Sequence, residues 1–122
     1  QGFGMFSLIE RASGRWLGQA GPWKPDGWPG NEVGWTFHPD AWGKGYATEA
    51  AAAALDWAFA NLGWDDAIHC IHPANAASQA LARRLGSRNL GAVRLPAPYE
   101  DAPSDAWGQR RADWAENRKR SA

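Results

Sequence analysis

The residues with the clearest chemical potential lie between Trp42 and Glu49, where the sequence reads Trp-Gly-Lys-Gly-Tyr-Ala-Thr-Glu. Gly43 and Gly45 allow a tight turn with the backbone amides pointing inward, and a predicted helix follows. The start of a helix adds N–H groups without intrahelical partners and the positive end of the helix dipole. The segment therefore predicts a site for a phosphate or pyrophosphate.

The spacing of these glycines argues against two common phosphate loops. The segment lacks the four-residue gap of Gly-x-x-x-x-Gly-Lys-[Ser/Thr] and the three glycines of a dinucleotide fingerprint. Neither a nucleotide triphosphatase nor a Rossmann enzyme is supported. A simple turn from strand to helix, without a ligand, would use the same two glycines.

The elements that must position this loop follow from hydrophobic periodicity and turn residues. Strands are predicted over residues 4–10, 16–20, 32–38, 67–72, 90–95 and 105–109, and helices over 47–62, 75–85 and 110–120. The Gly- and Pro-rich segment 21–30 predicts a loop. A strand, a helix and a strand in succession over residues 32–72 indicate a parallel βαβ unit, so the loop lies between the first of these strands and the helix.

The strand before the loop alternates in character. One face carries Val33, Trp35 and Phe37, and the other carries Glu32, Gly34, Thr36 and His38. Gly34 within the strand predicts a β-bulge or a close approach of a ligand.

Length and charge exclude several classes of protein. With 122 residues we expect a single domain over 1–122, and thirteen Lys and Arg balance thirteen Asp and Glu, which gives no general attraction to nucleic acid or to an anionic membrane. One cysteine and the lack of a long apolar stretch favour a cytoplasmic setting. Because the chain begins at Gln1, we expect it to be a fragment or a processed form.

His69, Cys70 and His72 are residue types that bind metals. On a strand only Cys70 and His72 would share a face, and two ligands do not make a zinc site. We therefore predict structural roles for these residues and no metal site.

The nine tryptophans allow a function of a different class. Trp23, Trp28 and Trp35 would form an exposed platform for a sugar or a peptide. The alternative is that most tryptophans are structural and replace scarce Leu and Ile in the core. The candidates for the core are Trp16, Trp35, Trp57 and Trp64.

Several motifs occur in a fixed order: Glu-Val-Gly-Trp at 32–35, His-Pro-x-x-Trp-Gly-Lys-Gly-Tyr-Ala-Thr-Glu-Ala at 38–50, Pro-x-Asn-x-x-Ser at 73–78 and Leu-Gly at 85–86. The set resembles the GNAT superfamily of acetyl-CoA-dependent N-acetyltransferases. The most similar branch includes the ribosomal-protein N-terminal alanine and serine acetyltransferases, and the likeness runs from about residue 14 to 114.

This resemblance implies an α/β (α+β) fold with a mixed, mostly antiparallel sheet and helices on both faces. Its central parallel strands, ending near His38 and His72, would separate to admit the pantetheine arm of acetyl-CoA. The acetyl group would pass by direct attack to a primary amine. A protein N-terminus, a small amine and an aminoglycoside all stay open as acceptors.

The resemblance also implies roles for single residues. Glu32 would deprotonate the amine and Ser78 would protonate the leaving thiolate, while backbone amides near Trp35 to Phe37 would bind the developing oxyanion. The other interpretations are a surface charge for Glu32 and a helix N-cap for Asn75. The residues expected to bind the cofactor are Phe37, Trp42, Gly43, Lys44, Gly45, Tyr46, Ala47, Thr48 and Asn75.

The sequence departs from the family in three places. Trp42 stands where Arg or Gln is usual, and Ser87 stands where Phe is usual. The family's first strand and its first two helices have no counterpart in the sequence. We therefore expect an upstream segment, or a homodimer formed through the strand at 4–10, and a CoA-binding domain without catalytic activity is the alternative function.

Overall fold

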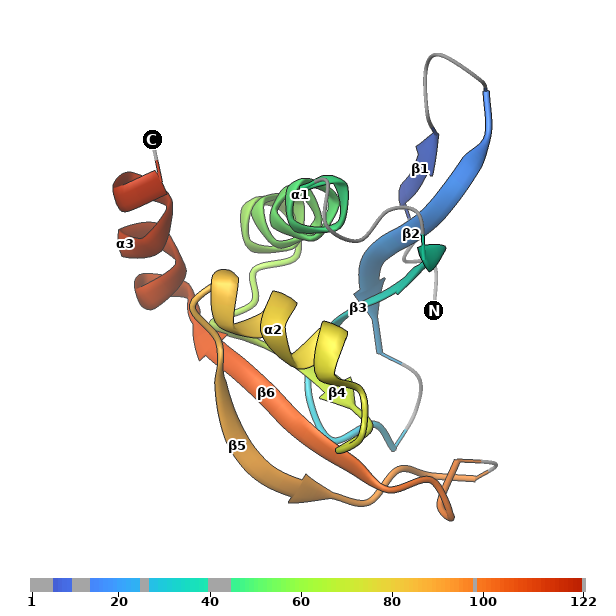
Figure 1. Cartoon of the computed structure of the whole chain (residues 1–122). Helices are drawn as coiled ribbons and strands as arrows, with labels where there is room; N and C mark the ends of the chain where they lie inside the picture. Colours follow the sequence, from blue (N-terminus) through green and yellow to red (C-terminus); the bar gives the residue numbers. More distant parts are fainter. Residues whose placement is uncertain (1–5, 10–13, 25–26, 40–44, 98, 122) are drawn as a thin grey trace.

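The computed structural model describes residues 6–9, 14–24, 27–39, 45–97 and 99–121 (Figure 1). Its elements are β1 Phe6–Ile9, β2 Trp16–Trp23, β3 Glu32–Phe37, α1 Tyr46–Asn61, β4 Asp66–Ile71, α2 Ala76–Arg84, β5 Arg88–Val93, β6 Ser104–Arg110 and α3 Arg111–Ser121. Each strand and helix predicted from the sequence has a counterpart here. None of the helices in the described ranges is long and apolar enough to cross a membrane.

The strands within the described residues form one six-stranded sheet in the order β1-β2-β3-β4-β6-β5. β3 and β4 are parallel, and the other neighbouring pairs are antiparallel. The mixed, mostly antiparallel sheet with a central parallel pair is therefore confirmed. Helix α1 makes the crossover that two parallel neighbours require.

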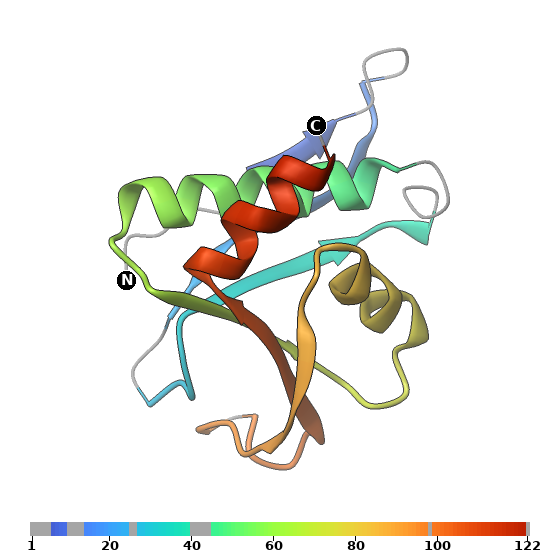
Figure 2. The ribbon, with the colours of Figure 1, turned by 90° about the vertical axis from the view of Figure 1, so that its left-hand side faces the viewer.

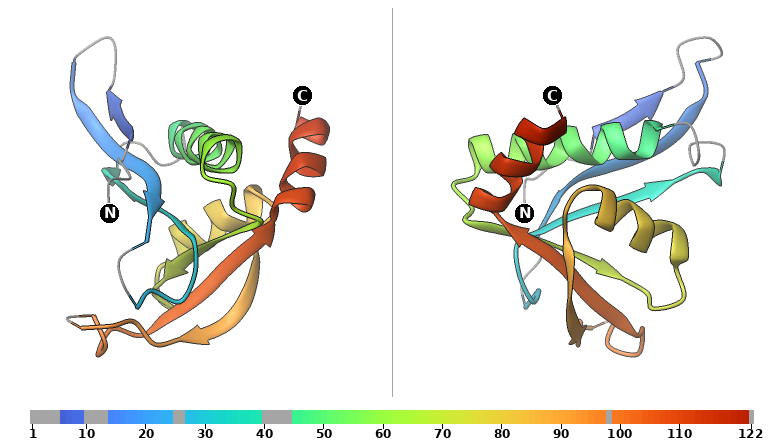
Figure 3. Two further views of the ribbon diagram at one scale, coloured as in Figure 1. Left: turned by 180° about the vertical axis from the view of Figure 1, so that it is seen from behind. Right: turned by 60° about the vertical axis from the view of Figure 1, so that its left-hand side comes forward.

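The three described helices lie on one face of the sheet (Figures 2 and 3). This differs from the predicted arrangement with helices on both faces. The physical reason is a shared core, because α1, α2 and α3 all contribute to one hydrophobic cluster. Alternate residues of β3 divide between this covered face, which takes Val33, and the opposite face, which takes Glu32.

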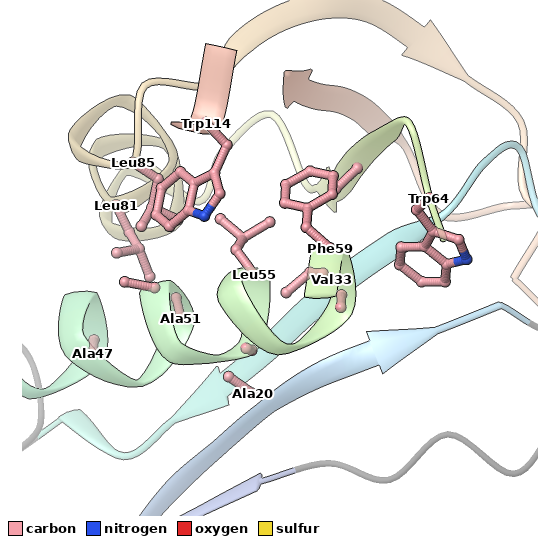
Figure 4. Packing of buried hydrophobic residues seen from close by; sticks show 14 residues of the cluster. Ala20, Val33, Ala47, Ala51, Leu55, Phe59, Trp64, Leu81, Leu85 and Trp114 are labelled. Atoms are coloured by element: carbon pink, nitrogen blue, oxygen red, sulfur yellow. The ribbon is translucent and has the colours of Figure 1, made fainter. Parts of the chain in front are cut away.

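The shared core is built from small and large side chains in contact (Figure 4). Ala51, Leu55 and Phe59 lie at helical spacing on α1 and are buried, and the many alanines let the helix lie close to the sheet. The tryptophan assignment was only partly correct, because Trp16 is 46% exposed and Trp57 is 38% exposed. Trp64 is buried as expected, and Trp107 and Trp114 are buried as well.

Strand β2 runs three residues into the segment that was predicted to be a loop, and it includes Pro22. Gly21 pairs with Gly34 of β3, so the backbone nitrogen of Pro22 points to the other side, toward β1. The described pairing with β1 ends at Ala20. Proline is tolerated here because its missing N–H faces away from the β3 ladder.

Candidate functional site

The site begins where β3 and β4 separate. Within the described residues this parallel ladder holds one pair, Glu32 with Ile68, and the Ile68 N–H donates to the Asn31 carbonyl at 2.8 Å. Toward their carboxyl ends the two strands run apart (Figure 3, right). This is the separation that the family resemblance implied for the central strands.

Two side chains take the place of the next backbone bond. In a continuing parallel ladder the Cys70 N–H would donate to the Val33 carbonyl. Here the Cys70 N–H donates to Oε2 of Glu32 at 2.7 Å, and the Val33 carbonyl lies 2.8 Å from Nδ1 of His69. The two backbone groups that the ladder would have paired therefore both have partners in this opening between β3 and β4.

Glu32 is a buried carboxylate, and the surface-charge interpretation is wrong. Its side chain is 5% exposed, and Oε1 accepts a hydrogen bond from Nε1 of Trp28 at 2.7 Å. Burial raises the pKa of Glu32 above its ordinary value, while the hydrogen bonds from Cys70 and Trp28 limit the rise. The carboxylate lies over Gly34, where an added Cβ would meet Oε2 at 3.4 Å.

Cys70 is half-buried beside this carboxylate. Burial and the negative charge of Glu32 raise the pKa of the thiol to about 12, so the thiol is neutral near pH 7. His72 is exposed, and its Nδ1 accepts a hydrogen bond from the Ala74 N–H. In the part of the chain that the structure describes, no three His, Cys, Asp or Glu residues come together as metal ligands.

The backbone of β3 directs alternate amides into the opening. The His38 N–H donates to the Leu17 carbonyl at 2.7 Å, so the even-numbered residues bond to β2 and the amides of Trp35 and Phe37 point toward β4. The bulge predicted at Gly34 is absent, since the register between β2 and β3 is continuous. Ordinary alternation is sufficient to present these amides.

Ser78 lies on the covered face of the opening and is buried. Its Oγ accepts a hydrogen bond from Nε1 of Trp35 at 3.1 Å, which leaves its own proton available for another acceptor. Asn75 acts as the N-cap of α2, because its Oδ1 accepts from the Ser78 N–H at 3.0 Å. The structure thus joins Trp35, Ser78 and Asn75 across two elements.

The glycine loop leads into α1. Gly45 has φ +80°, and the first helical bond runs from the Glu49 N–H to its carbonyl at 3.0 Å. The amides of residues 46–48 therefore precede the hydrogen-bond ladder of the helix. Because the Ala47 side chain is buried, this residue can offer a ligand only its backbone. Trp42, Gly43 and Lys44 lie outside the described residues.

A cavity of about 410 Å³ adjoins this helix start. It brings Gly45 and Thr48 next to two arginines of α2 and α3, which the sequence had not linked to the loop. Arg118 is exposed, and its guanidinium lies 2.7 Å from Oδ2 of Asp56. The lining residues are Gly45, Thr48, Glu49, Ala52, Arg84, Leu85, Trp114, Asn117 and Arg118.

The predicted tryptophan platform does not form as proposed. Trp23 and Trp28 meet edge to face with ring centroids 6.0 Å apart, but Trp35 packs on the covered face. Tyr99, from the β5–β6 connection, instead meets Trp28 at 5.7 Å. Trp28 also donates to Glu32, so it connects this group of rings to the buried carboxylate.

Comparison with known proteins identifies the family. The acetyltransferase (GNAT) domain matches residues 1–88, and the chain belongs to this family of acetyltransferases. The uncharacterized N-acetyltransferase YnaD of Bacillus subtilis (strain 168) is 37% identical over 60 residues, which are 49% of this chain and 35% of YnaD. The chain thus spans about a third of the length of this relative.

Solved structures of similar fold are also acetyltransferases. An acetyltransferase from Agrobacterium tumefaciens is 31% identical, with a TM-score of 0.72 over 90% of this chain and 62% of that one. The ribosomal-protein-S5-alanine acetyltransferase of Vibrio fischeri shares the fold at 17% identity, with a TM-score of 0.68 over 87% and 60%. RimJ of Mycobacterium smegmatis, solved with CoA-disulfide, also shares the fold at 19% identity. Its TM-score is 0.68 over 96% of this chain and 60% of that one.

Proposed function

We propose that this chain binds acetyl-CoA in the opening between β3 and β4 and transfers its acetyl group to a primary amine, either a protein N-terminus or a small amine. The observation that carries the proposal is the opening itself, which exposes polar groups of β3 between a buried carboxylate and a buried hydroxyl. The solved relative that holds CoA-disulfide supports the choice of cofactor.

Glu32 is the proposed base. Its raised pKa makes it a stronger proton acceptor than an exposed carboxylate, and each of its oxygens keeps a lone pair beside the bonds from Trp28 and Cys70. It takes the proton of the attacking amine, directly or through water. The neutral thiol of Cys70 favours direct attack by the amine over an acetylated cysteine.

Ser78 is the proposed acid. When the bond between the carbonyl carbon and the sulfur breaks, the Ser78 hydroxyl gives its proton to the thiolate and recovers one from water. Trp35 fixes the Ser78 oxygen by donating to it, so the serine proton is free to point elsewhere. The Trp35 amide, which points into the opening, is the proposed donor to the developing oxyanion.

The start of α1 is the proposed pyrophosphate site. The left-handed Gly45 and the amides of residues 46–48 offer donors at the positive end of the helix dipole. We also assign Phe37, Trp42, Gly43, Lys44 and Asn75 to the cofactor by the family pattern. The cavity beside Gly45 has room for the nucleotide end, and Arg84 supplies a positive charge there.

Turnover of acetyl-CoA with a panel of amines tests the proposal. The panel should include peptides that begin with Ala or Ser, a polyamine and an aminoglycoside, and free CoA should be measured. We expect CoA release that depends on the amine, together with acetylated product by mass spectrometry. Binding of CoA without turnover would instead favour a non-catalytic CoA-binding domain, and absence of binding would contradict both functions.

A further inference from the structure

His69 is a buried, neutral histidine between the two strands. It is 1% exposed, and burial lowers its pKa to about 4. Its Nδ1 lies 2.8 Å from the Val33 carbonyl and its Nε2 lies 2.9 Å from Oγ of Ser87. Because a carbonyl can only accept, Nδ1 carries the proton and Nε2 accepts from the serine hydroxyl.

Ser87 is anchored in turn. Its Oγ accepts a hydrogen bond from Nε2 of Gln109 at 3.0 Å, and Oε1 of Gln109 accepts from Nδ2 of Asn117 at 3.0 Å. The polar chain thus connects β3 through β4 and β6 to α3. It also explains why a small polar residue can stand at 87, where the family usually has phenylalanine.

The imidazole of His69 also packs against the ring of Trp35. Its ring lies 4.6 Å from the Trp35 ring, centroid to centroid, and Trp35 donates to Ser78. A change at His69 can therefore reach the proposed acid through one intervening side chain.

We propose that His69 is a positioning residue that keeps the β3–β4 opening in the shape that binds CoA, with Ser87 fixing its tautomer. By donating to the Val33 carbonyl, His69 occupies the acceptor that the Cys70 amide would need to close the ladder by one more bond. The proposal rests on the proposed function, because it concerns the same cofactor.

Two near-isosteric variants distinguish a positioning role of His69 from a purely structural role. His69→Asn places an amide N–H where Nδ1 lies, so it keeps the bond to Val33 and loses the bond to Ser87. His69→Gln places its amide near Nε2, so it keeps Ser87 and loses Val33. Each variant loses one buried hydrogen bond, and we expect similar melting temperatures for the two.

Isothermal titration with CoA is the decisive measurement. We expect His69→Asn to bind CoA within about 2-fold of the parent chain, and His69→Gln to bind about 5- to 10-fold more weakly. Equal affinities in the two variants would overturn the positioning role while leaving CoA binding, and hence the proposed function, intact. If the parent chain itself does not bind CoA, the proposed function and this inference fail together.

A spectroscopic measurement on the parent chain tests the proposal even if a variant does not fold. Long-range ¹H–¹⁵N NMR should show the His69 ring as neutral with the proton on Nδ1 between pH 6 and 8. A proton on Nε2 would mean that the bond to Val33 does not exist, and would overturn the proposal without any variant.

Discussion

Strand β4 has two edges that differ in how they are held. Along the β6 edge, backbone pairs run without interruption from Asp66 with Arg110 to Ile71 with Asp105. Along the β3 edge, one described pair is followed by a hydrogen bond from the Cys70 N–H to the Glu32 carboxylate and one from His69 to the Val33 carbonyl. Backbone bonds tolerate many side chains, whereas the β3 edge requires particular ones.

The two edges of β4 therefore have different roles. The β6 edge stabilises the sheet, and under the proposed function the β3 edge keeps polar groups available for acetyl-CoA. Substitutions along the β3 edge should therefore change CoA binding or turnover, while matched substitutions elsewhere should leave both unchanged.

The largest effect is expected at the start of α1, which follows β3. Gly45→Val should abolish CoA binding, by more than about 100-fold, because a β-branched side chain would block the approach of the pyrophosphate to the backbone. The matched control is Gly63→Val at the other end of α1. Both glycines have positive φ and open space around an added Cβ, so both variants should lose stability by about 1–2 kcal/mol. Loss of CoA binding in both variants, measured by titration, would contradict the pyrophosphate assignment.

The next effect concerns the base. Glu32→Gln should lower kcat by about 100-fold and leave the Kd for CoA almost unchanged, since glutamine can still accept one of the two hydrogen bonds but cannot take a proton. Asp66→Asn, an exposed residue at the start of β4, is the control and should keep full activity. A Glu32→Gln enzyme with the parental kcat and the same acidic limb in its pH profile would exclude Glu32 as the base.

The β3 edge should also make the stability of the chain depend on pH, because it contains the buried His69. The folded chain binds a proton at His69 only near pH 4, whereas the unfolded chain does so near 6.5. Between these values the unfolded state holds more protons, so stability is complete above about pH 6.5 and falls as the pH is lowered toward 4. The loss amounts to as much as about 3 kcal/mol.

Urea unfolding of the parent and His69→Gln from pH 4 to 7 measures this loss. The raised pKa of Glu32 acts in the opposite direction, but it is present in both proteins and cancels in their difference. The exposed His72→Gln is the control. If the parent and His69→Gln show parallel pH dependence, His69 is not buried in its neutral form.

The smallest effect is expected at the proposed acid. Ser78→Ala should lower kcat about 10-fold with little change in CoA affinity, because water can partly replace the serine proton. Ser104→Ala is the matched buried serine on β6, at the other edge of β4. Equal kcat values for Ser78→Ala and the parent would remove Ser78 from the mechanism, and a loss of activity in Ser104→Ala would remove the contrast between the edges.

Much of the fold could be predicted because its signals are local. Alternation identified β3, helical spacing identified α1, and Asn75 capped α2 as its residue type suggested. The loop predicted around Pro22 was wrong in part, because the effect of a proline depends on which side of the strand its missing N–H faces. The position of the helices likewise depends on a core shared by α1, α2 and α3.

The site was less predictable, because its bonds join residues far apart in the chain. Glu32 meets the Cys70 amide across 38 positions, and Trp35 meets Ser78 across 43. Strand alternation assigned His69 a structural role, but its bond to Ser87 appears only after α2 has been packed. The sequence signals that could have suggested this bond are a histidine within the apolar run 67–71 and a serine at position 87, where the family usually has phenylalanine.

The central claim is that CoA binds where side chains replace the β3–β4 ladder, and amide NMR during a CoA titration tests it most directly. The Trp35 amide should shift and become protected from hydrogen exchange, together with the amides of residues 46–48, while amides of β6 should change little. Protection confined to β5, β6 and α3, with Trp35 unchanged at saturating CoA, would contradict the account.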